Sequence, residues 1–138
     1  MCIRDRNGKV VIVTGGNAGI GYETAKSIAI MGAHTIIACR SREKATTAIE
    51  QMKQEINELH PDKSVTIEFM ILDLGSFRST KDFTVAFKEK NLPLHILINN
   101  AGILGHPQVM TEDGNESHFQ VNHPGHFLLT LQLSLIHI

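Results

Sequence analysis

The sequence predicts an α/β fold, a doubly wound parallel sheet with helices on both faces. Short apolar runs rich in β-branched residues alternate along the chain with longer segments of helical period. The first apolar run, residues 10–13, breaks at once into a glycine-rich turn that leads into a helical pattern. Parallel strands joined through helices require right-handed crossovers. We therefore expect a sheet truncated after about four strands, the first part of such a fold.

Each element follows from a local pattern of side chains. We expect strands at residues 9–13, 34–38, 65–72 and 95–99, and helices at 19–31, 42–59, 76–90 and from about 113 onward. In the first helix, one row at helical spacing contains Ile20, Thr24 and Ile28, beside Ala25 and Ala29.

The third and fourth helices carry more specific signals. Ser76 is expected to cap the third helix, with Phe83, Ala86 and Phe87 facing inward. Pro124 falls inside the fourth helix, where a proline costs ~3 kcal/mol unless it lies in the first turn or at a kink. Beyond it we expect an uncovered apolar face formed by Phe127, Leu128 and Leu131.

The bulk composition argues against several classes of protein. The chain has 138 residues and a formal net charge of −1, so we expect one domain at most and no nucleic-acid partner. No apolar run reaches the ~18 residues that a membrane span needs. Cys2 and Cys39 form no disulfide framework, which favours a reducing, intracellular compartment.

We assign the predicted domain to residues 8–133. The segments 1–6 and 134–138 carry no start or stop signal that fits the pattern, so we expect both ends to be foreign. On this interpretation the chain is a fragment of a longer protein.

The turn at residues 14–21, Thr-Gly-Gly-Asn-Ala-Gly-Ile-Gly, predicts a site for the diphosphate of a dinucleotide. Gly15, Gly19 and Gly21 let the backbone turn tightly and approach a phosphate closely. The start of the next helix presents unpaired N–H groups to the anion. A strand before the glycines and a helix after them supply the context of a Rossmann-type nucleotide site.

The end of the second expected strand bears on the choice of cofactor. An NAD site expects an acidic residue ~20 positions after the glycines, where it binds the ribose 2′-hydroxyl. Arg40 stands there instead, and no Asp or Glu occurs before Glu43. A guanidinium can bind a 2′-phosphate through its planar fork, which predicts NADP in preference to NAD. The alternative is that Arg40 is a solvated surface charge.

Polar side chains also follow the third and fourth strands. Asp73 could accept a hydrogen bond from an adenine amino group, cap the following helix, or do both. Asn99 and Asn100, with Gly102, suit hydrogen bonding to a ribose or bracing of neighbouring strands, against the alternative of a plain turn. Ligands of such sheets bind at the carboxyl ends of the strands, so we expect these strand ends to form one site.

These motifs resemble the short-chain dehydrogenase/reductase family, and within it the retinol-dehydrogenase-like branch. The resemblance covers residues 8 to about 133 and rests on the glycine turn, Asp73, Asn-Asn-Ala-Gly at 99–102, and Asn122. It implies an NADP(H)-dependent oxidoreductase that interconverts a lipophilic alcohol and its aldehyde or ketone. The intact protein could also form a homo-oligomer or associate with a membrane.

The resemblance assigns roles to single residues as well. They are the diphosphate contacts Asn17 and Ile20, the adenine neighbours Asp73 and Leu74, the ribose contacts Asn99 and Ala101, and Asn122 as support for a proton relay. The family's serine and its Tyr-x-x-x-Lys pair would lie beyond the last residue of this chain, so we expect no turnover from these residues alone. A catalytically inert nucleotide-binding or scaffold fragment is the alternative.

Two local patterns suggest other chemistry. Tyr22 and Lys26 have the Tyr-x-x-x-Lys spacing but lie far too early, so we expect a packed tyrosine and a solvated lysine. His123 and His126 are spaced like a metal-binding pair on a helix, but no third ligand stands in a recognisable motif. We expect no metal site.

Overall fold

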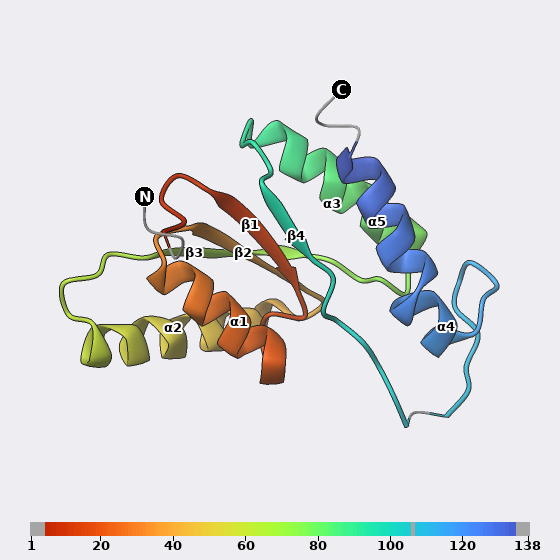
Figure 1. Cartoon of the computed structure of the whole chain (residues 1–138). Coiled ribbons are helices and arrows are strands. Elements are labelled where there is room, and N and C mark those ends of the chain that lie inside the picture. Colours follow the sequence, from red (N-terminus) through yellow and green to blue (C-terminus); the bar gives the residue numbers. More distant parts are fainter. Residues whose placement is uncertain (1–4, 106, 135–138) are drawn as a thin grey trace.

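The computed structural model describes residues 5–105 and 107–134 (Figure 1). Its elements in chain order are β1 (Val10–Thr14), α1 (Gly19–Ile30), β2 (His34–Cys39), α2 (Arg42–Leu59), β3 (Thr66–Ile71), α3 (Phe77–Glu89), β4 (Ile96–Ile98), α4 (Ser117–Asn122) and α5 (Pro124–Ser134). Cys2 and most of the two segments predicted to be foreign, 1–6 and 134–138, lie outside the described residues.

The four strands form one parallel sheet in the order β3-β2-β1-β4, which confirms the predicted fold class. The chain adds β2 and β3 on one side of β1 and then returns to place β4 on the other side. The strand order therefore reverses at β1, and the ends of β1 and β4 open onto the place where such sheets bind ligands.

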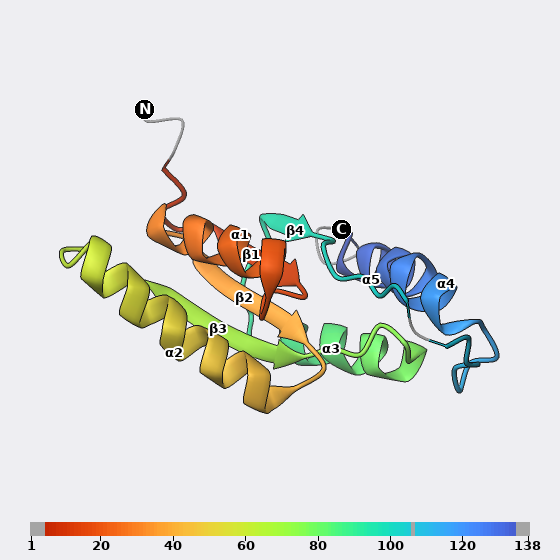
Figure 2. The same ribbon diagram turned by 90° about the horizontal axis from the view of Figure 1, so that it is seen from below.

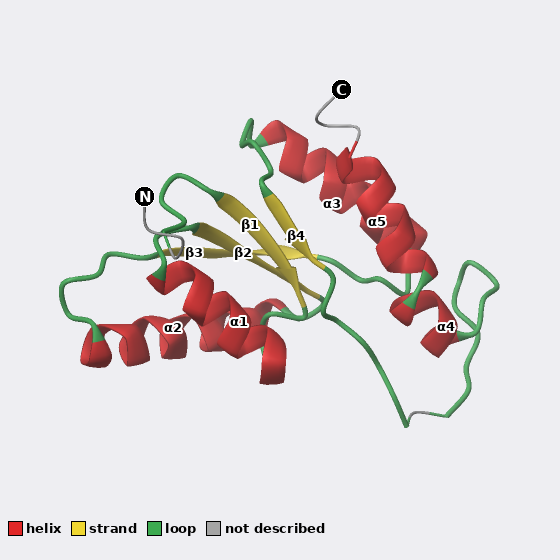
Figure 3. Ribbon diagram, viewed as in Figure 1, coloured by secondary structure: helices red, strands yellow, loops and turns green. Residues whose placement is uncertain are grey.

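Helices cover both faces of the sheet. Figures 1, 2 and 3 show α1 and α2 on one face, and α3 and α5 on the other. Alternate side chains of β1 supply both cores: Val11 and Val13 pack with α1 and α2, whereas Val10 and Ile12 pack with α3 and α5. Burial on both faces explains why the central strands are apolar throughout.

Two helices present somewhat different faces from those that the sequence suggested. In α1 the small residues Ala25 and Ala29 are buried, whereas Ile20 is 81% exposed beside the glycine turn. In α3 the expectation for Ala86 was wrong, because this residue is exposed. The buried face of α3 is centred on Phe83 and Phe87, and it is completed by Thr80 and Thr84.

The last predicted helix is two helices. Instead of one helix from about residue 113, α4 ends at Asn122 and α5 begins at Pro124, with His123 in a non-helical conformation between them. Pro124 thus occupies the first position of a helix, where its missing N–H costs nothing. After the break, Gly125 packs against the loop that follows β3. A Cβ on Gly125 would lie 2.5 Å from the carbonyl oxygen of Leu74.

The outer side of α4 and α5 carries exposed apolar side chains. Phe127 and Leu131 are exposed as expected, Leu128 is half-buried, and Phe119 adds to the same surface. Within the described ranges, no helix is long and apolar enough to cross a membrane.

We predict that Phe83→Ala lowers the free energy of unfolding by about 3–5 kcal/mol, because Phe83 is 2% exposed and its removal leaves a cavity. Val85→Ala in the same helix is the control, since Val85 is 56% exposed and should change stability by no more than about 0.5 kcal/mol. Urea denaturation followed by circular dichroism measures both. Equal losses would contradict this packing of α3.

Candidate functional site

A pocket of about 450 Å³ lies at the carboxyl ends of the strands. Nine of the residues predicted to bind a cofactor line it, namely Gly15, Asn17, Ile20, Gly21, Arg40, Asp73, Leu74, Ala101 and Gly102. Gly19, Asn99 and Asn122 are not among its lining residues. The fold thus gathers four distant strand ends into one site, and the role of each residue in cofactor binding stays a prediction.

The glycine turn packs closely against the segment that follows β4. A Cβ on Gly21 would lie 2.4 Å from both Asn100 Nδ2 and the Gly15 carbonyl oxygen. Gly15 has a φ of +66°, and its own Cβ would come within 3.1 Å of Ala101 Cβ. No larger side chain fits at residue 21 unless the two strand ends separate.

The start of α1 offers free anion-binding groups. Ala18 stands at the N-cap and provides no capping side chain, so the first N–H groups of α1 receive no side-chain partner there. A Cβ on Gly19 would meet no atom within 4 Å, which leaves the space above the turn open. An uncapped helix start facing open space fits a diphosphate.

The Thr14 hydroxyl joins the end of β1 to the residues after β4. Its oxygen accepts hydrogen bonds from the backbone N–H groups of Asn100 and Ala101, each at 2.9 Å. The Asn100 side chain also donates to the Thr14 carbonyl oxygen, at 2.9 Å. Sequence analysis missed Thr14, although a threonine that ends an apolar strand directly before the glycines was a visible signal.

Asn122 and Asn99 join this loop to the last two helices. Asn122 Oδ1 accepts from the N–H of Ile103 at 2.8 Å, and its Nδ2 donates to the Ile103 carbonyl at 2.9 Å. Asn99 Nδ2 donates to the Thr130 hydroxyl at 3.0 Å. Both side chains therefore brace the loop beside the pocket.

The β2 end of the pocket carries positive charge. Arg40 is exposed there, and Lys44 lines the same pocket from the first turn of α2, which Ser41 caps through a 3.2 Å bond from Lys44 N–H. Sequence analysis did not select Lys44, although its position four residues after Arg40 was a usable signal. Burial raises the pKa of the neighbouring Cys39 thiol, which disfavours the reactive thiolate.

Asp73 lies at the end of β3 without capping α3. Its Oδ1 accepts from Gly75 N–H at 2.9 Å, whereas Ser76 caps the helix by accepting from Ser79 N–H at 3.2 Å. The expected cap at Ser76 is confirmed, and the capping alternative for Asp73 is wrong because Asp73 lies too far before the helix. Asp73 faces the pocket, where its adenine role stays a prediction.

A glutamate caps the helix that carries Asn122. The Glu116 carboxylate accepts from the N–H groups of His118 at 3.0 Å and Phe119 at 2.9 Å. These backbone bonds, with a side-chain bond from His118, lower the pKa of Glu116 to about 2.

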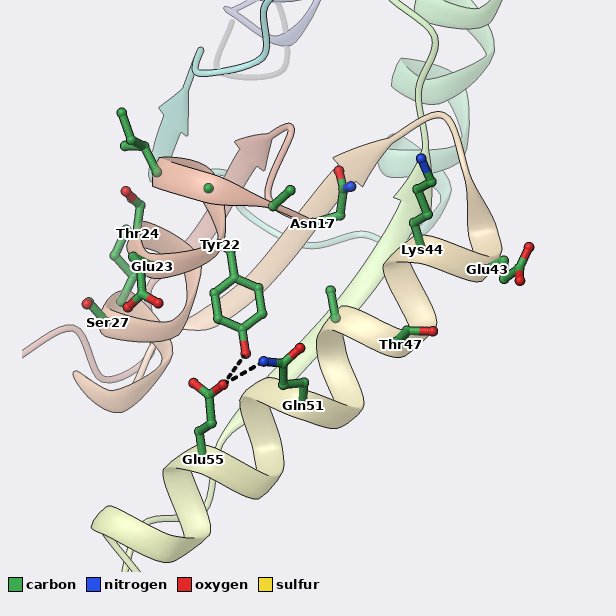
Figure 4. A pocket seen from close by; sticks show the side chains of 15 residues that line it. Asn17, Tyr22, Glu23, Thr24, Ser27, Glu43, Lys44, Thr47, Gln51 and Glu55 are labelled. Carbon is green, nitrogen blue, oxygen red and sulfur yellow. Dashed lines mark hydrogen bonds between the residues drawn. The ribbon is translucent and has the colours of Figure 1, made fainter.

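Tyr22 lines a larger, open hollow of about 1230 Å³ between α1 and α2 (Figure 4). Figure 4 shows Tyr22 and Gln51 directed at Glu55, to which they donate at 3.1 and 2.8 Å. Lys26 is paired with Glu55 at 2.7 Å and with Glu23, so the expectation of a solvated lysine was wrong. Burial and the Glu55 acceptor raise the pKa of Tyr22 to about 12, the wrong direction for proton transfer near neutral pH.

His123 and His126 do not converge on a common point. His126 Nε2 lies 2.9 Å from the Thr14 hydroxyl, whereas His123 is exposed between the rings of Phe119 and Phe127. Across the part of the chain that the structure describes, no three His, Cys, Asp or Glu side chains group as metal ligands would.

The comparison with known families settles which family this geometry represents. Residues 9–135 match the model of the short chain dehydrogenase family. The chain belongs to this family. Relatives named as oxidoreductases and solved structures with the same fold agree with this match, so the predicted family resemblance is confirmed.

Two curated relatives and one solved structure illustrate the similarity. A WW domain-containing oxidoreductase from Gallus gallus is 52% identical over 126 residues, covering 91% of this chain and 29% of the relative. A polyprenol dehydrogenase from Homo sapiens is 48% identical over 125 residues, covering 91% of this chain and 36% of the relative. The RhlG/NADP complex of Pseudomonas aeruginosa is 26% identical, with a TM-score of 0.76, and the match covers 95% of this chain and 48% of that one.

The chain thus spans about a third of the length of these curated relatives. Within the branch, the predicted resemblance to the family member named for chromosome X, with the WW domain-containing oxidoreductase as a near second, rests on the runs 19–26, 93–102, 111–114 and 125–130. Proteins of the second name are among the relatives found.

We predict that Gly21→Val destabilises the chain by about 1–3 kcal/mol and weakens dinucleotide binding, because the new side chain pushes Asn100 away from Thr14. Ser27→Val places the same residue on an exposed position of α1 and should leave both properties nearly unchanged. Thermal unfolding and calorimetric titration provide the measurements. A Gly21→Val chain with unaltered stability and binding would contradict the close approach.

A second prediction concerns acid stability. Because the pKa of Glu116 is depressed, its contribution to stability is fully present above the ordinary value of 4.5 and disappears as the pH falls toward about 2. The difference in unfolding free energy between the wild type and Glu116→Gln should therefore be constant above pH ~5 and shrink below it. Urea titrations at several pH values test this, and a difference that persists at pH ~2 would refute the assigned cap.

Proposed function

We propose that this chain forms the NADP(H)-binding part of an oxidoreductase that interconverts a lipophilic alcohol and its aldehyde or ketone. The observation that carries the proposal is the pocket at the strand ends, with Arg40 and Lys44 at its β2 side and an uncapped helix start at its glycine turn. Both features favour an anionic dinucleotide.

The cofactor preference is argued from charge at the end of β2. A carboxylate there would bind a ribose 2′-hydroxyl and repel a 2′-phosphate. Arg40 presents a guanidinium at this point and Lys44 adds an ammonium group. The next acid in the sequence, Glu43, lines the other hollow, and the carboxylate in this pocket, Asp73, comes from the end of β3. A 2′-phosphate therefore gains charge-assisted hydrogen bonds in this pocket.

The substrate class is supported by family relationship. The Homo sapiens relative at 48% identity is named a polyprenol dehydrogenase, and a second protein with that name, from Danio rerio, is 44% identical. The name specifies an alcohol as the substrate of those proteins. We extend the class, a lipophilic alcohol and its carbonyl product, to the longer protein that would contain this chain.

The chain's own residues would bind and orient the reactants. The first N–H groups of α1 receive the diphosphate, Arg40 receives the 2′-phosphate, and the loop fixed by Thr14 supports the ribose. The nicotinamide, when bound, supplies or accepts the hydride. Asn122 is bonded to the Ile103 backbone and would keep the adjoining loop in place while a proton relay operates.

We predict that Arg40→Ala weakens NADPH binding by about 10–100-fold and leaves NADH binding nearly unchanged, because each lost charge-assisted bond is worth ~1.5–3 kcal/mol. Arg42→Ala is the matched control, since Arg42 stacks 5.1 Å from the centre of the Phe69 ring and does not line this pocket. Calorimetric titration of both cofactors provides the comparison. Equal losses for NADPH and NADH would overturn the assignment, and so would an equal effect of Arg42→Ala.

A further inference from the structure

His126 is a buried, titratable side chain that the proposed chemistry does not use. It lies near the start of α5 and is 8% exposed. Its Nε2 is 2.9 Å from the Thr14 hydroxyl, which belongs to a strand 112 residues earlier in the chain. The contact therefore connects the last helix directly to the end of β1, at the edge of the pocket.

The hydrogen bonds around the Thr14 hydroxyl can be assigned by counting donors and acceptors. A hydroxyl has one proton to donate and two lone pairs to accept with. Both lone pairs are used by the N–H groups of Asn100 and Ala101 at 2.9 Å. The single proton must therefore go either to His126 Nε2 at 2.9 Å or to the Ile98 carbonyl at 3.4 Å.

The state of the imidazole decides between these two acceptors. His126 also bonds to the backbone of Val121 and Asn122, and these bonds favour the protonated ring, so the imidazole is the donor in them. A neutral imidazole has one N–H and one acceptor nitrogen. With the N–H used on the backbone, Nε2 is the acceptor, and the shorter bond from Thr14 goes to it.

His126 is the middle one of three evenly spaced side chains. Asn122, His126 and Thr130 follow one another at intervals of four residues, across the break between α4 and α5. Asn122 is hydrogen-bonded to Ile103, and Thr130 to Asn99, so these two side chains contact the segment 99–103 near its two ends. Between them, His126 contacts Thr14, whose hydroxyl accepts from the amides of Asn100 and Ala101. His126 and Thr130, four residues apart, share one side of α5, and Asn122 at the end of α4 adds a third contact to the same region.

We infer that His126 is a positioning residue of the cofactor site: by accepting the Thr14 proton, it directs both lone pairs of that hydroxyl at the Asn100 and Ala101 amides. That a dinucleotide lies on the loop of Asn100 and Ala101 is taken from the proposed function. Burial lowers the pKa of the imidazole, which keeps the ring in the neutral form that can accept.

Amide hydrogen exchange on the 138-residue chain without cofactor tests the positioning. In His126→Phe the amides of Asn100 and Ala101 should exchange about 10-fold faster, because only the longer bond to Ile98 remains for the Thr14 proton. The amides of Ile37 and Met52, in the core, should be unaffected. His126→Gln restores an acceptor near the Nε2 position and should return the exchange to within about threefold of wild type. His123→Phe, at the exposed neighbouring histidine, should change nothing.

A second pair of variants keeps the test decisive if His126→Phe does not fold. Thr14→Val removes the hydroxyl and should expose the same two amides, whereas Thr14→Ser should protect them. Where both single variants fold, His126→Phe added to Thr14→Val should cause no further loss, because both act through one bond. Unchanged exchange at Asn100 and Ala101, additive effects, or a loss spread equally to Ile37 and Met52 would overturn the inference.

Titration with NADPH separates this inference from the proposed function. His126→Phe should weaken NADPH binding by about 10-fold and His126→Gln should restore it; unaltered affinity despite faster exchange would refute the role at the cofactor site. Failure of the wild-type chain to bind NADPH or NADH would instead count against the proposed function. In that case the exchange data alone decide whether His126 positions the loop.

Discussion

The close approach between the end of β1 and the residues after β4 is the contact on which the rest of the structure depends. The two strands are paired in register at Val11, Ile12 and Val13, with a further hydrogen bond from His95 N–H to the Val10 carbonyl. Beyond Val13 Asn100 continues the connection by donating twice to Thr14, from its backbone N–H to the hydroxyl and from its side-chain amide to the carbonyl oxygen. This arrangement leaves no room for a Cβ at Gly21. One contact thus fixes the turn, the start of α1 and the floor of the pocket together.

The first half of the fold was predictable because its elements carry local signals. Strands buried on both faces become apolar runs, and α2 repeats buried side chains at helical spacing, so the expected bounds of this helix agree with those observed. The last helix was not predictable in the same way. A proline inside an apolar helical pattern can either break a helix or start one, and the local pattern does not decide between the two. In the structure Pro124 starts α5, and Gly125 packs against the Leu74 carbonyl, about fifty residues earlier in the chain.

The same distinction applies to the site. The glycine turn and Arg40 could be chosen from the sequence, because ligands of a doubly wound sheet bind at the carboxyl ends of its strands and both directly follow a strand. Thr14 was not selected, and His126 was considered only as one of a metal-binding pair, since their contact arises only when α5 is brought to β1. Lys26 shows the reverse error: it looked like a solvated charge until Glu55 of α2 was placed beside it. The site residues that follow from one strand and its turn were therefore predictable from the sequence. The residues whose roles depend on contacts between distant elements were not.

The ionisable groups near the pocket are arranged to hold the site in place, and this bears on where the proposed reaction obtains its proton. Carbonyl reduction needs a donor whose pKa lies near neutrality. Burial and hydrogen bonding to Glu55 raise the pKa of Tyr22 to about 12, and burial raises the pKa of the Cys39 thiol. Burial lowers the pKa of His126, whose Nε2 lies 2.9 Å from the Thr14 hydroxyl. Each of these three groups is engaged in a hydrogen bond within the fold: Tyr22 with Glu55, Cys39 with Ser41 and His126 with Thr14. In the proposed oxidoreductase the proton donor therefore belongs to residues other than these.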